Sequence, residues 1–562
     1  MAKYVIGIDF GTLSARAILV NVETGEESPR LSEQKYPHAV METELPNGVK
    51  LPVDYALQDP RDYTMAISAV CRDLIEGNKI TADDVVGLGI DFTACTVLPI
   101  DKDGVPLCTT EKYEKDPLAW VQLWKHHGAQ DYANRITEIA ESRGEDFLPK
   151  IGGKEGSEAM FPRLWKICEE DPELYDDMDE YIEAGDWIVG QITGRYGHNS
   201  CATAGIRGLW YPDAGFPSPD FFKALNPKME NVIGDKIKYP ITTVGTRAGV
   251  IDEKGAEMTG LNVGTPVAVP LIDCYSGVPG SLNAPKAGQM CLVMGTSGCH
   301  MMLGDEYHIV PGTYGGSKDN MIPGLYGYEA GQSGFGDHLA WYVANGVPEE
   351  YEKAAHKAGR NIHQYLTDKA EKLAPGESGL LALDWWNGNR SILVDNDLTG
   401  TMLGLRLTTR PEEIYRALIE AIAYGTRIIV ENFEQNGVPV KEIYASGGMS
   451  RKNDMLMQIF ADVTGRPIKI ASSENCGALG AAVLASLAAG SDNGGYDDTI
   501  TACSKLVSAP IKEFEPDAKA HATYDKLFDE YVKLHDYFGR GENDVMKRLK
   551  AIQAEAISSK ED

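Results

Sequence analysis

The sequence predicts an α/β protein in which two large domains face one cleft. At 562 residues the chain is longer than the roughly 250–300 residues that a single hydrophobic core supports. Apolar runs typical of buried strands alternate with segments of helical spacing, such as residues 61–75. Residues 4–20 and 289–303 share one layout of strand, polar tip and strand, so the second half is predicted to repeat the first.

Residues 4–20 are predicted to form a buried β-hairpin with a small, polar tip. The first apolar run ends at Asp9, Gly11 and Thr12 follow, and Arg16 lies at the start of the second run. Free backbone N–H groups at such a tip can hold an anion, and an aspartate oxygen beside them can bind a hard cation. The hairpin is therefore a candidate magnesium–phosphate site, and an ordinary edge hairpin is the alternative.

The second tip is Gly295-Thr296-Ser297, between two apolar runs. Two such tips could grip a polyphosphate from both sides if their domains face one cleft. Closure of that cleft would also exclude water from the reaction.

Two further aspartates follow apolar strands. Asp91 and Thr93 lie at the polar tip between the predicted strands of residues 85–101, where Asp91 either accepts turn N–H bonds or forms a wall of a substrate pocket. Asp273 ends the apolar run 267–272 and precedes a small-residue helix start. Ligands of open α/β sheets bind beyond the carboxyl ends of strands, so Asp273 is a candidate general base, with a helix N-cap as the alternative.

Other polar residues lie in stretches that are weaker signals by themselves. Arg207 is a lone cation in residues 201–210, which are expected to form a loop, and it faces either solvent or a ligand. Glu329 follows a stretch rich in glycine. The adjacent His126 and His127 point to different sides of the chain, which argues against a shared metal, and Trp124 beside them either packs or faces a polyol.

Residues 443–453 read as a strand, a Gly447-Gly448 turn and a helix start that Ser450 can cap. Because the two glycines have no side chains, a flat ring could approach the backbone there. The P-loop motif G-x-x-x-x-G-K-[ST] is absent from the sequence.

Composition and charge exclude several classes of partner. The net charge of −30, from 53 Lys and Arg against 83 Asp and Glu, argues against nucleic acid and against an anionic membrane. No apolar run approaches the roughly 20 residues of a membrane span. The N-terminal residues enter the first strand without an apolar leader, and the ten cysteines form no C-x-x-C pair, so a cytoplasmic protein is predicted, with a homodimer left open.

Taken in order, these motifs resemble the FGGY carbohydrate kinases of the actin/hexokinase/Hsp70 superfamily. Residues 8–16 resemble the first phosphate loop of that family, 295–297 the second, and 447–453 the adenosine motif, across roughly residues 4–485. The resemblance implies two ribonuclease-H-like domains that flank an ATP and sugar cleft. Residues 1–284 would carry the sugar site, the first phosphate loop and the catalytic aspartate. Residues 285–490 would carry the second phosphate loop and the adenosine site, and 491–562 a helical tail packed on the core.

The resemblance also implies roles for individual residues. Asp273 would be the catalytic base, Ala94, Arg207 and Glu329 would lie near the sugar, with Asp91 as a wall of the same pocket, and Asp9 would hold Mg²⁺. The residues expected to bind ATP are Gly11, Thr12, Arg16, Gly295, Thr296, Ser297, Gly447, Gly448 and Asn453.

The implied reaction is transfer of the γ-phosphoryl group of ATP to a terminal hydroxyl of a ketopentose. L-ribulose, a sugar of L-arabinose catabolism, is the first candidate, and D-ribulose, ribitol, xylulose and glycerol are alternatives. An Hsp70-like ATPase would need a separate peptide-binding domain, for which the last 70 or so residues are too short. A non-catalytic sugar-binding relative would be expected to lose Asp9 or Asp273. One departure is Ala204-Gly205-Ile206-Arg207, where similar members carry Ala-Gly-Tyr-Lys, because Arg presents a planar fork and Lys a point charge.

Overall fold

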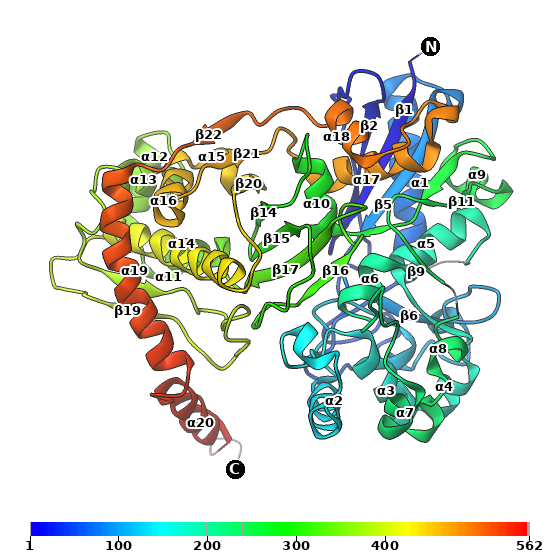
Figure 1. Cartoon of the computed structure of the whole chain (residues 1–562), viewed down its shortest axis with the longest axis horizontal. Helices are drawn as coiled ribbons and strands as arrows, with labels where there is room; N and C mark the ends of the chain where they lie inside the picture. Colours follow the sequence, from blue (N-terminus) through cyan, green and yellow to red (C-terminus); the bar gives the residue numbers. More distant parts are fainter. Residues whose placement is uncertain (1, 197–198, 239, 559–562) are drawn as a thin grey trace.

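The computed structural model describes residues 2–196, 199–238 and 240–558, and it has two lobes, each centred on a seven-stranded sheet (Figure 1). The first lobe is the sheet that contains the N-terminal strand, with the helices packed on it. The second lobe is the sheet that begins at residue 289, with its helices. A third region of short strands and helices, within residues 36–242, lies beside the first lobe.

The first sheet has the strand order β11-β12-β5-β1-β2-β3, and β13 also pairs with β5. β1 runs antiparallel to β2 and parallel to β5, so the predicted N-terminal hairpin supplies a central strand. The strands are β1 (Tyr4–Phe10), β2 (Ser14–Asn21), β3 (Ser32–Lys35), β5 (Val85–Phe92), β11 (Arg247–Val250), β12 (Pro266–Ala268) and β13 (Leu271–Ile272).

The second sheet repeats this topology in the order β16-β17-β15-β14-β20-β21-β22. β14 is antiparallel to β15 and parallel to β20, as β1 is to β2 and β5. β22 ends the sheet antiparallel to β21, as β11 does beside β12, so the predicted repeat is present in the strand order. The strands are β14 (Gln289–Met294), β15 (Gly298–Gly304), β16 (Gly316–Lys318), β17 (Tyr326–Gln332), β20 (Glu442–Ser446), β21 (Ile468–Ile470) and β22 (Lys512–Phe514).

Helices cover both faces of the first sheet. α1 and α5 pack on one face and α17 and α18 on the other, each against buried apolar side chains of the strands. The helices of this lobe are α1 (Pro60–Asn78), α5 (Ala184–Thr193), α9 (Glu253–Thr259), α10 (Asp273–Ser281), α17 (Cys476–Ala489) and α18 (Thr499–Leu506).

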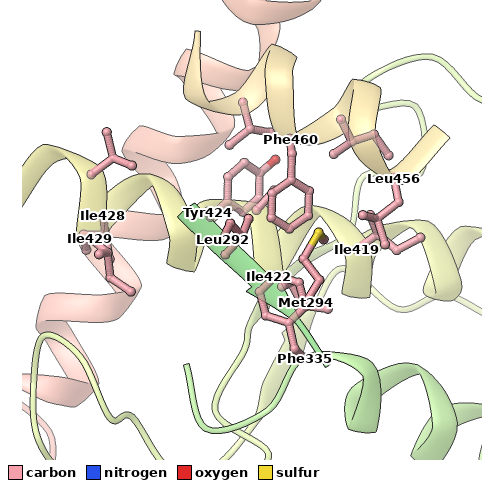
Figure 2. Close-up of a cluster of buried hydrophobic side chains, with 14 of the residues drawn as sticks. Leu292, Met294, Phe335, Ile419, Ile422, Tyr424, Ile428, Ile429, Leu456 and Phe460 are labelled. Carbon is pink, nitrogen blue, oxygen red and sulfur yellow. The ribbon is translucent and has the colours of Figure 1, made fainter. Parts of the chain in front are cut away.

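The long helix α14 lies at the centre of the second lobe's core. Figure 2 shows Ile419 and Ile422 of α14 gathered with Leu292 of β14 and Phe460 of α16. The helices of this lobe are α11 (Gly336–Gly346), α12 (Glu349–Lys357), α13 (Ile362–Ala370), α14 (Pro411–Gln435), α15 (Gly448–Lys452), α16 (Asp454–Thr464), α19 (Ala518–Gly539) and α20 (Val545–Ser558), and its minor strands are β18 (Leu381–Leu383) and β19 (Thr401–Leu403).

The third region has its own apolar core and the four-stranded sheet β4-β7-β6-β8. Residues 201–206 form the helix α6, so the expectation of a loop at 201–210 was wrong. Ser200 caps this helix by accepting the N–H of Ala202, and Arg207 follows its last turn. The elements are β4 (Leu57–Gln58), β6 (Val97–Ile100), β7 (Val121–Gln122), β8 (Glu180–Glu183), β9 (Asn199–Ser200), β10 (Ile241–Thr242), α2 (Gln130–Arg143), α3 (Met160–Glu170), α4 (Pro172–Asp177), α6 (Cys201–Ile206), α7 (Pro219–Leu225) and α8 (Val232–Asp235).

The segment after residue 490 is more than a helical tail. Its strand β22 extends the second sheet, and α19 buries Tyr524, Phe528 and Tyr531 in the core of the second lobe. The last four residues of the predicted tail, 559–562, lie outside the described part. No helix within the described residues is long and apolar enough to cross a membrane.

α17 packs so closely on the first sheet and on α10 that glycines occupy the contact points. A Cβ atom at Gly7 of β1 would stand 1.9 Å from the carbonyl oxygen of Ala478, and Gly89 of β5 is equally close to α17. Between the helices, a Cβ at Gly480 would stand 1.9 Å from the Ser276 carbonyl oxygen. Any larger residue at these glycines would push the elements apart, because close-packed interiors have no spare room.

Replacing Gly480 by alanine is expected to lower the free energy of unfolding by about 3 kcal/mol, because the new methyl group meets the Ser276 carbonyl. Urea-induced unfolding followed by circular dichroism measures this change. Gly156→Ala is the control, since a Cβ there has no neighbour nearer than 4.0 Å, and it should stay within about 0.5 kcal/mol of the wild type. Equal stability of the two variants would contradict the packing argument.

Candidate active site

Three aspartates lie side by side at the carboxyl edge of the first sheet. Asp9 on β1 is the register partner of Asp91 on β5, and Leu271 of β13 pairs with Asp91 from the other side. Asp273 follows β13 directly and begins α10. Paired residues of neighbouring parallel strands point to the same face, so the fold brings these predicted site residues together.

Burial and mutual repulsion raise the pKa values of these carboxyl groups. The pKa of Asp91 lies well above its usual range because the side chain is buried and Asp9 and Asp273 are negatively charged neighbours. Burial likewise raises the pKa of Asp9, and burial together with the charge of Asp9 raises that of Asp273 to about 7. Neither oxygen of Asp91 accepts a hydrogen bond from a described residue. Asp91 is therefore a buried acidic side chain without a hydrogen-bond donor among the described residues, and a bound cation would stabilise it.

The N-terminus of α17 lies against the same carboxylates. A Cβ at Gly477, in the first turn, would stand 3.3 Å from Asp9 Oδ2 and 3.5 Å from Asp91 Oδ2. The free N–H groups of a first helical turn carry partial positive charge. The hydroxyl of Ser276 on α10 donates to the Gly477 carbonyl over 2.7 Å, which fixes the starts of the two helices beside each other.

Both predicted phosphate loops are short turns with accessible backbone. In the first, the N–H of Gly11 donates to the Ser14 carbonyl over 3.0 Å. In the second, the N–H of Gly295 donates to the Ser297 carbonyl over the same distance, and Gly295 and Thr296 are exposed. The two tips therefore have similar local geometry on equivalent hairpins of the two lobes.

Thr12 and Arg16 of the first loop have different surroundings. The Thr12 hydroxyl accepts a hydrogen bond from Nε1 of Trp124 at 3.1 Å, so this loop is tied to the third region. Arg16 is half exposed, and its Nε donates to Glu33 Oε1 at 3.2 Å. The charge of Arg16 is therefore paired on the surface of the sheet.

Arg207 and Glu329 come from the third region and the second lobe and form a buried ion pair. Arg207 donates to Glu329 Oε1 over 2.9 Å and to Glu158 Oε2 over 3.2 Å, and its guanidinium lies 3.9 Å from the centre of the Tyr314 ring. The second oxygen of Glu329 accepts the hydroxyl of Tyr275 at 2.7 Å. Arg207 is only 6% exposed, so it is a buried residue and not a surface cation.

A cavity of about 550 Å³ adjoins this network. Glu158 and Arg207 line it from the third region, and Tyr314 and Arg390 line it from the second lobe. Ala94 is half-buried on the turn after β5, where its carbonyl accepts the hydroxyl of Thr96 at 3.3 Å.

A second cavity, of about 750 Å³, lies in the second lobe beside the second phosphate loop. Gly295, Gly448 and Asn453, three of the predicted ATP-binding residues, line it. Gly447 lies outside the lining, with a φ of 92° that turns the chain between β20 and α15. Ser450 is not a helix cap, because it lies inside α15 and its hydroxyl donates to the Gly447 carbonyl.

One wall of this cavity was not predicted from the sequence: α13 supplies it with His363, Gln364 and Thr367. The local signal for this helix is a capping box, in which Asn361 and Gln364 each accept a backbone N–H of the other. Such a pattern predicts where a helix begins but not what it packs against.

Most of the chain matches one protein family. Residues 4–280 match the N-terminal domain of the FGGY family of carbohydrate kinases, and residues 290–489 match its C-terminal domain. The chain belongs to this family. It is therefore an ATP-dependent carbohydrate kinase whose substrates are ATP and a sugar, which confirms the predicted family and activity and excludes the chaperone and non-catalytic alternatives.

Curated relatives match along the whole chain. A ribulokinase of Geobacillus thermodenitrificans is 49% identical over 560 residues, covering 100% of this chain and 99% of the relative. A ribulokinase of Halalkalibacterium halodurans is 50% identical over 555 residues, covering 98% of each chain.

Solved structures confirm the fold. The xylulose kinase from Rhodospirillum rubrum superposes with a TM-score of 0.77 at 22% identity, covering 95% of this chain and 98% of that chain. The glycerol kinase of Plasmodium falciparum with ADP superposes with a TM-score of 0.75 at 17% identity, covering 95% and 98%. At these identities the likeness shows the two-domain fold alone.

Asp91→Asn is expected to stabilise the ligand-free protein at pH 7, because the amide is neutral and can donate to Asp9. The raised pKa of Asp91 means that its stabilising protonated form is lost as pH rises, so the gain from Asn should grow from pH 5 to pH 8. A rise in Tm on the order of 2 °C, seen by calorimetry, is the expected size.

Asp59→Asn is the matched control, since Asp59 is also fully buried but its oxygens accept from the backbone and guanidinium of Arg61. This variant should lose stability. A lower Tm for Asp91→Asn than for the wild type at every pH would contradict the inference that the buried charge of Asp91 destabilises the ligand-free protein.

Proposed function

We propose that this kinase transfers the γ-phosphoryl group of ATP to a terminal hydroxyl of L-ribulose. The observation that supports the proposal is the row of Asp9, Asp91 and Asp273 on neighbouring strands, beside α10, whose Tyr275 hydroxyl holds Glu329 of the Arg207–Glu329 pair. The choice of sugar is supported by relatives named ribulokinase that are about half identical along the full chain.

Asp273 is the proposed general base. Its Oδ1 accepts the N–H of Cys274 at 2.7 Å, and this bond fixes the orientation of the carboxyl group. Its Oδ2 is left to accept the proton of the sugar hydroxyl. The hydroxyl oxygen then attacks the γ-phosphorus of ATP, and ADP leaves. A pKa of about 7 suits this step, because a base poised near the working pH combines ionisation with a useful affinity for the proton.

Asp9 and Asp91 fit a magnesium ion. Both are oxygen ligands, and the oxygens of Asp91 have no partner among the described residues. Among the described residues, the three aspartates included, no three His, Cys, Asp or Glu side chains are placed to hold one metal ion together, and Mg²⁺ commonly needs only one or two carboxylates because it keeps several waters. When bound with ATP, the ion would neutralise charge on the phosphates. Asp9 is its proposed ligand, and Asp91 adds negative charge beside it.

The remaining ATP contacts follow from the two loops and the second cavity. Gly11, Thr12, Gly295, Thr296 and Ser297 are the proposed phosphate cradle, since backbone N–H groups of such turns hold anions. Gly448 and Asn453 are proposed to hold the adenosine, with Gly447 shaping the turn behind them. Arg16 contributes long-range positive charge near the first loop, reduced by its pair with Glu33.

The sugar is proposed to lie between Asp273 and the Arg207–Glu329 pair, against Ala94. Carboxylate and guanidinium groups there supply acceptors and donors for the hydroxyl and carbonyl oxygens of a ketose. Because ATP is the co-substrate and the ten cysteines are free thiols, we place the protein in the cytoplasm.

A panel of L-ribulose, D-ribulose, xylulose, ribitol and glycerol tests the substrate in a coupled assay of ADP release. L-ribulose should give the highest kcat/KM of the five. No turnover of either ribulose would defeat the proposed sugar, while leaving the family assignment in place.

Asp273→Asn should lower kcat by about 10²–10⁴-fold, because the amide keeps the shape but cannot accept the proton. In the wild type, kcat/KM for the sugar should fall about tenfold per pH unit below pH 7, where Asp273 becomes protonated, and level off above it. Steady-state assays between pH 5.5 and 8.5 measure both effects. Full activity of Asp273→Asn would exclude Asp273 as the base.

A further inference from the structure

We propose that Arg163 is a positioning residue of the sugar site, which aligns the loops around the sugar with the first phosphate loop. The inference deepens the proposed function and rests on it for the location of the sugar. Arg163 lies on α3 and has no exposed surface.

The guanidinium of Arg163 is bound to backbone carbonyls and to no described carboxylate. Its Nη2 donates to the Leu123 carbonyl at 2.9 Å, and its Nε donates to the Ser157 carbonyl at 3.1 Å. Its other acceptors are the carbonyls of Cys95, Gln122, Trp124 and His126. Burial lowers the pKa of this guanidinium, so an ordinary structural role would favour an apolar side chain or a carboxylate partner here.

These carbonyls belong to three separate segments, and each segment carries part of the sugar side of the cleft. The first, residues 93–96, contains Ala94. The second, residues 122–127, contains Trp124, whose indole donates to Thr12 of the first phosphate loop. The third, residues 155–158, contains Glu158, which accepts from Arg207. One planar group therefore holds together the turn after β5, the link to the phosphate loop and the partner of Arg207.

The backbone at Cys95 shows why a strong donor is needed. Cys95 has a φ of 51°, the left-handed region that a residue with a side chain rarely adopts. Arg163 donates to the carbonyl of this residue, which helps to hold the unfavourable turn. The turn in its held shape follows Asp91 of β5 and packs Ala94 against the apolar cluster that contains Ile272 and Tyr275, on either side of Asp273.

Arg163→Lys tests this role. A lysine has one compact ammonium group, which cannot reach carbonyls on three segments as a planar fork does. The KM for the sugar should rise at least tenfold at saturating ATP, while the KM for ATP stays within twofold, because the nucleotide cavity lies in the other lobe. The probe is the sugar with the highest kcat/KM in the wild-type panel.

Arg416→Lys is the matched control. Arg416 is a buried arginine of the second lobe that donates to Glu420, to the Ala370 carbonyl and to Tyr524, far from the sugar segments. It should lower Tm to an extent comparable with Arg163→Lys and leave the KM for the sugar within twofold. Equal KM shifts in the two variants would reduce Arg163 to a structural residue and overturn the proposal.

Trp124→Phe decides the question if Arg163→Lys does not fold. It removes the indole N–H that joins residues 122–127 to Thr12, together with part of a half-buried ring, and the Tm measurement accounts for the lost packing. A fall of at least fivefold in kcat with an unchanged Tm would support alignment of the two sides, and wild-type kcat would overturn it. If the wild type prefers xylulose or glycerol, the proposed substrate alone is overturned. The KM values of the Arg163→Lys and Arg416→Lys variants are then compared with that preferred substrate.

Discussion

The close approach of α17 to β1, β5 and α10 is the contact on which the site depends. α17 lies between β21 and β22 of the second sheet in sequence, yet it packs on the first sheet, where Gly7 and Gly89 leave room for its backbone. Because the two helices touch at Gly480 and Ser276, the start of α17 lies beside the start of α10. The carboxyl edge of the first sheet, the starts of α10 and α17, and β14 of the second sheet, whose Val293 lies beside Gly277 of α10, therefore meet at one joint between the lobes.

Asp9, Asp91 and Asp273 lie at this joint, and the other described residues do not fully neutralise their negative charge. The three aspartates repel one another, and burial raises their pKa values further. The first turn of α17 supplies partial positive charge beside them, but Asp91 still has no hydrogen-bond donor among the described residues. Such a cluster is costly in the free protein, and the proposed magnesium ion would offset that cost if it binds there.

Local patterns predicted the two hairpins with their polar tips and the aspartates that follow strands, because each depends on residues close together in the sequence. The alignment of Asp9 with Asp91 was not predictable, because it depends on the register between strands separated by about 80 residues. The strand β22 was included in the predicted helical tail because its partner β21 lies more than 40 residues earlier in the sequence. Arg163 could not be distinguished from any helical arginine, since its acceptors are backbone carbonyls that sequence does not mark.

The arginine at position 207 can be understood from its partners. A lysine would hold Glu329 as a point charge, whereas the fork of Arg207 reaches both Glu329 and Glu158 and lies over the ring of Tyr314. Tyr275 fixes the second oxygen of Glu329, and each carboxylate oxygen can still accept another hydrogen bond. We infer that the arginine changes how Glu329 is held and not what Glu329 offers to a sugar. The departure from the lysine of similar family members is then compatible with the same class of substrate.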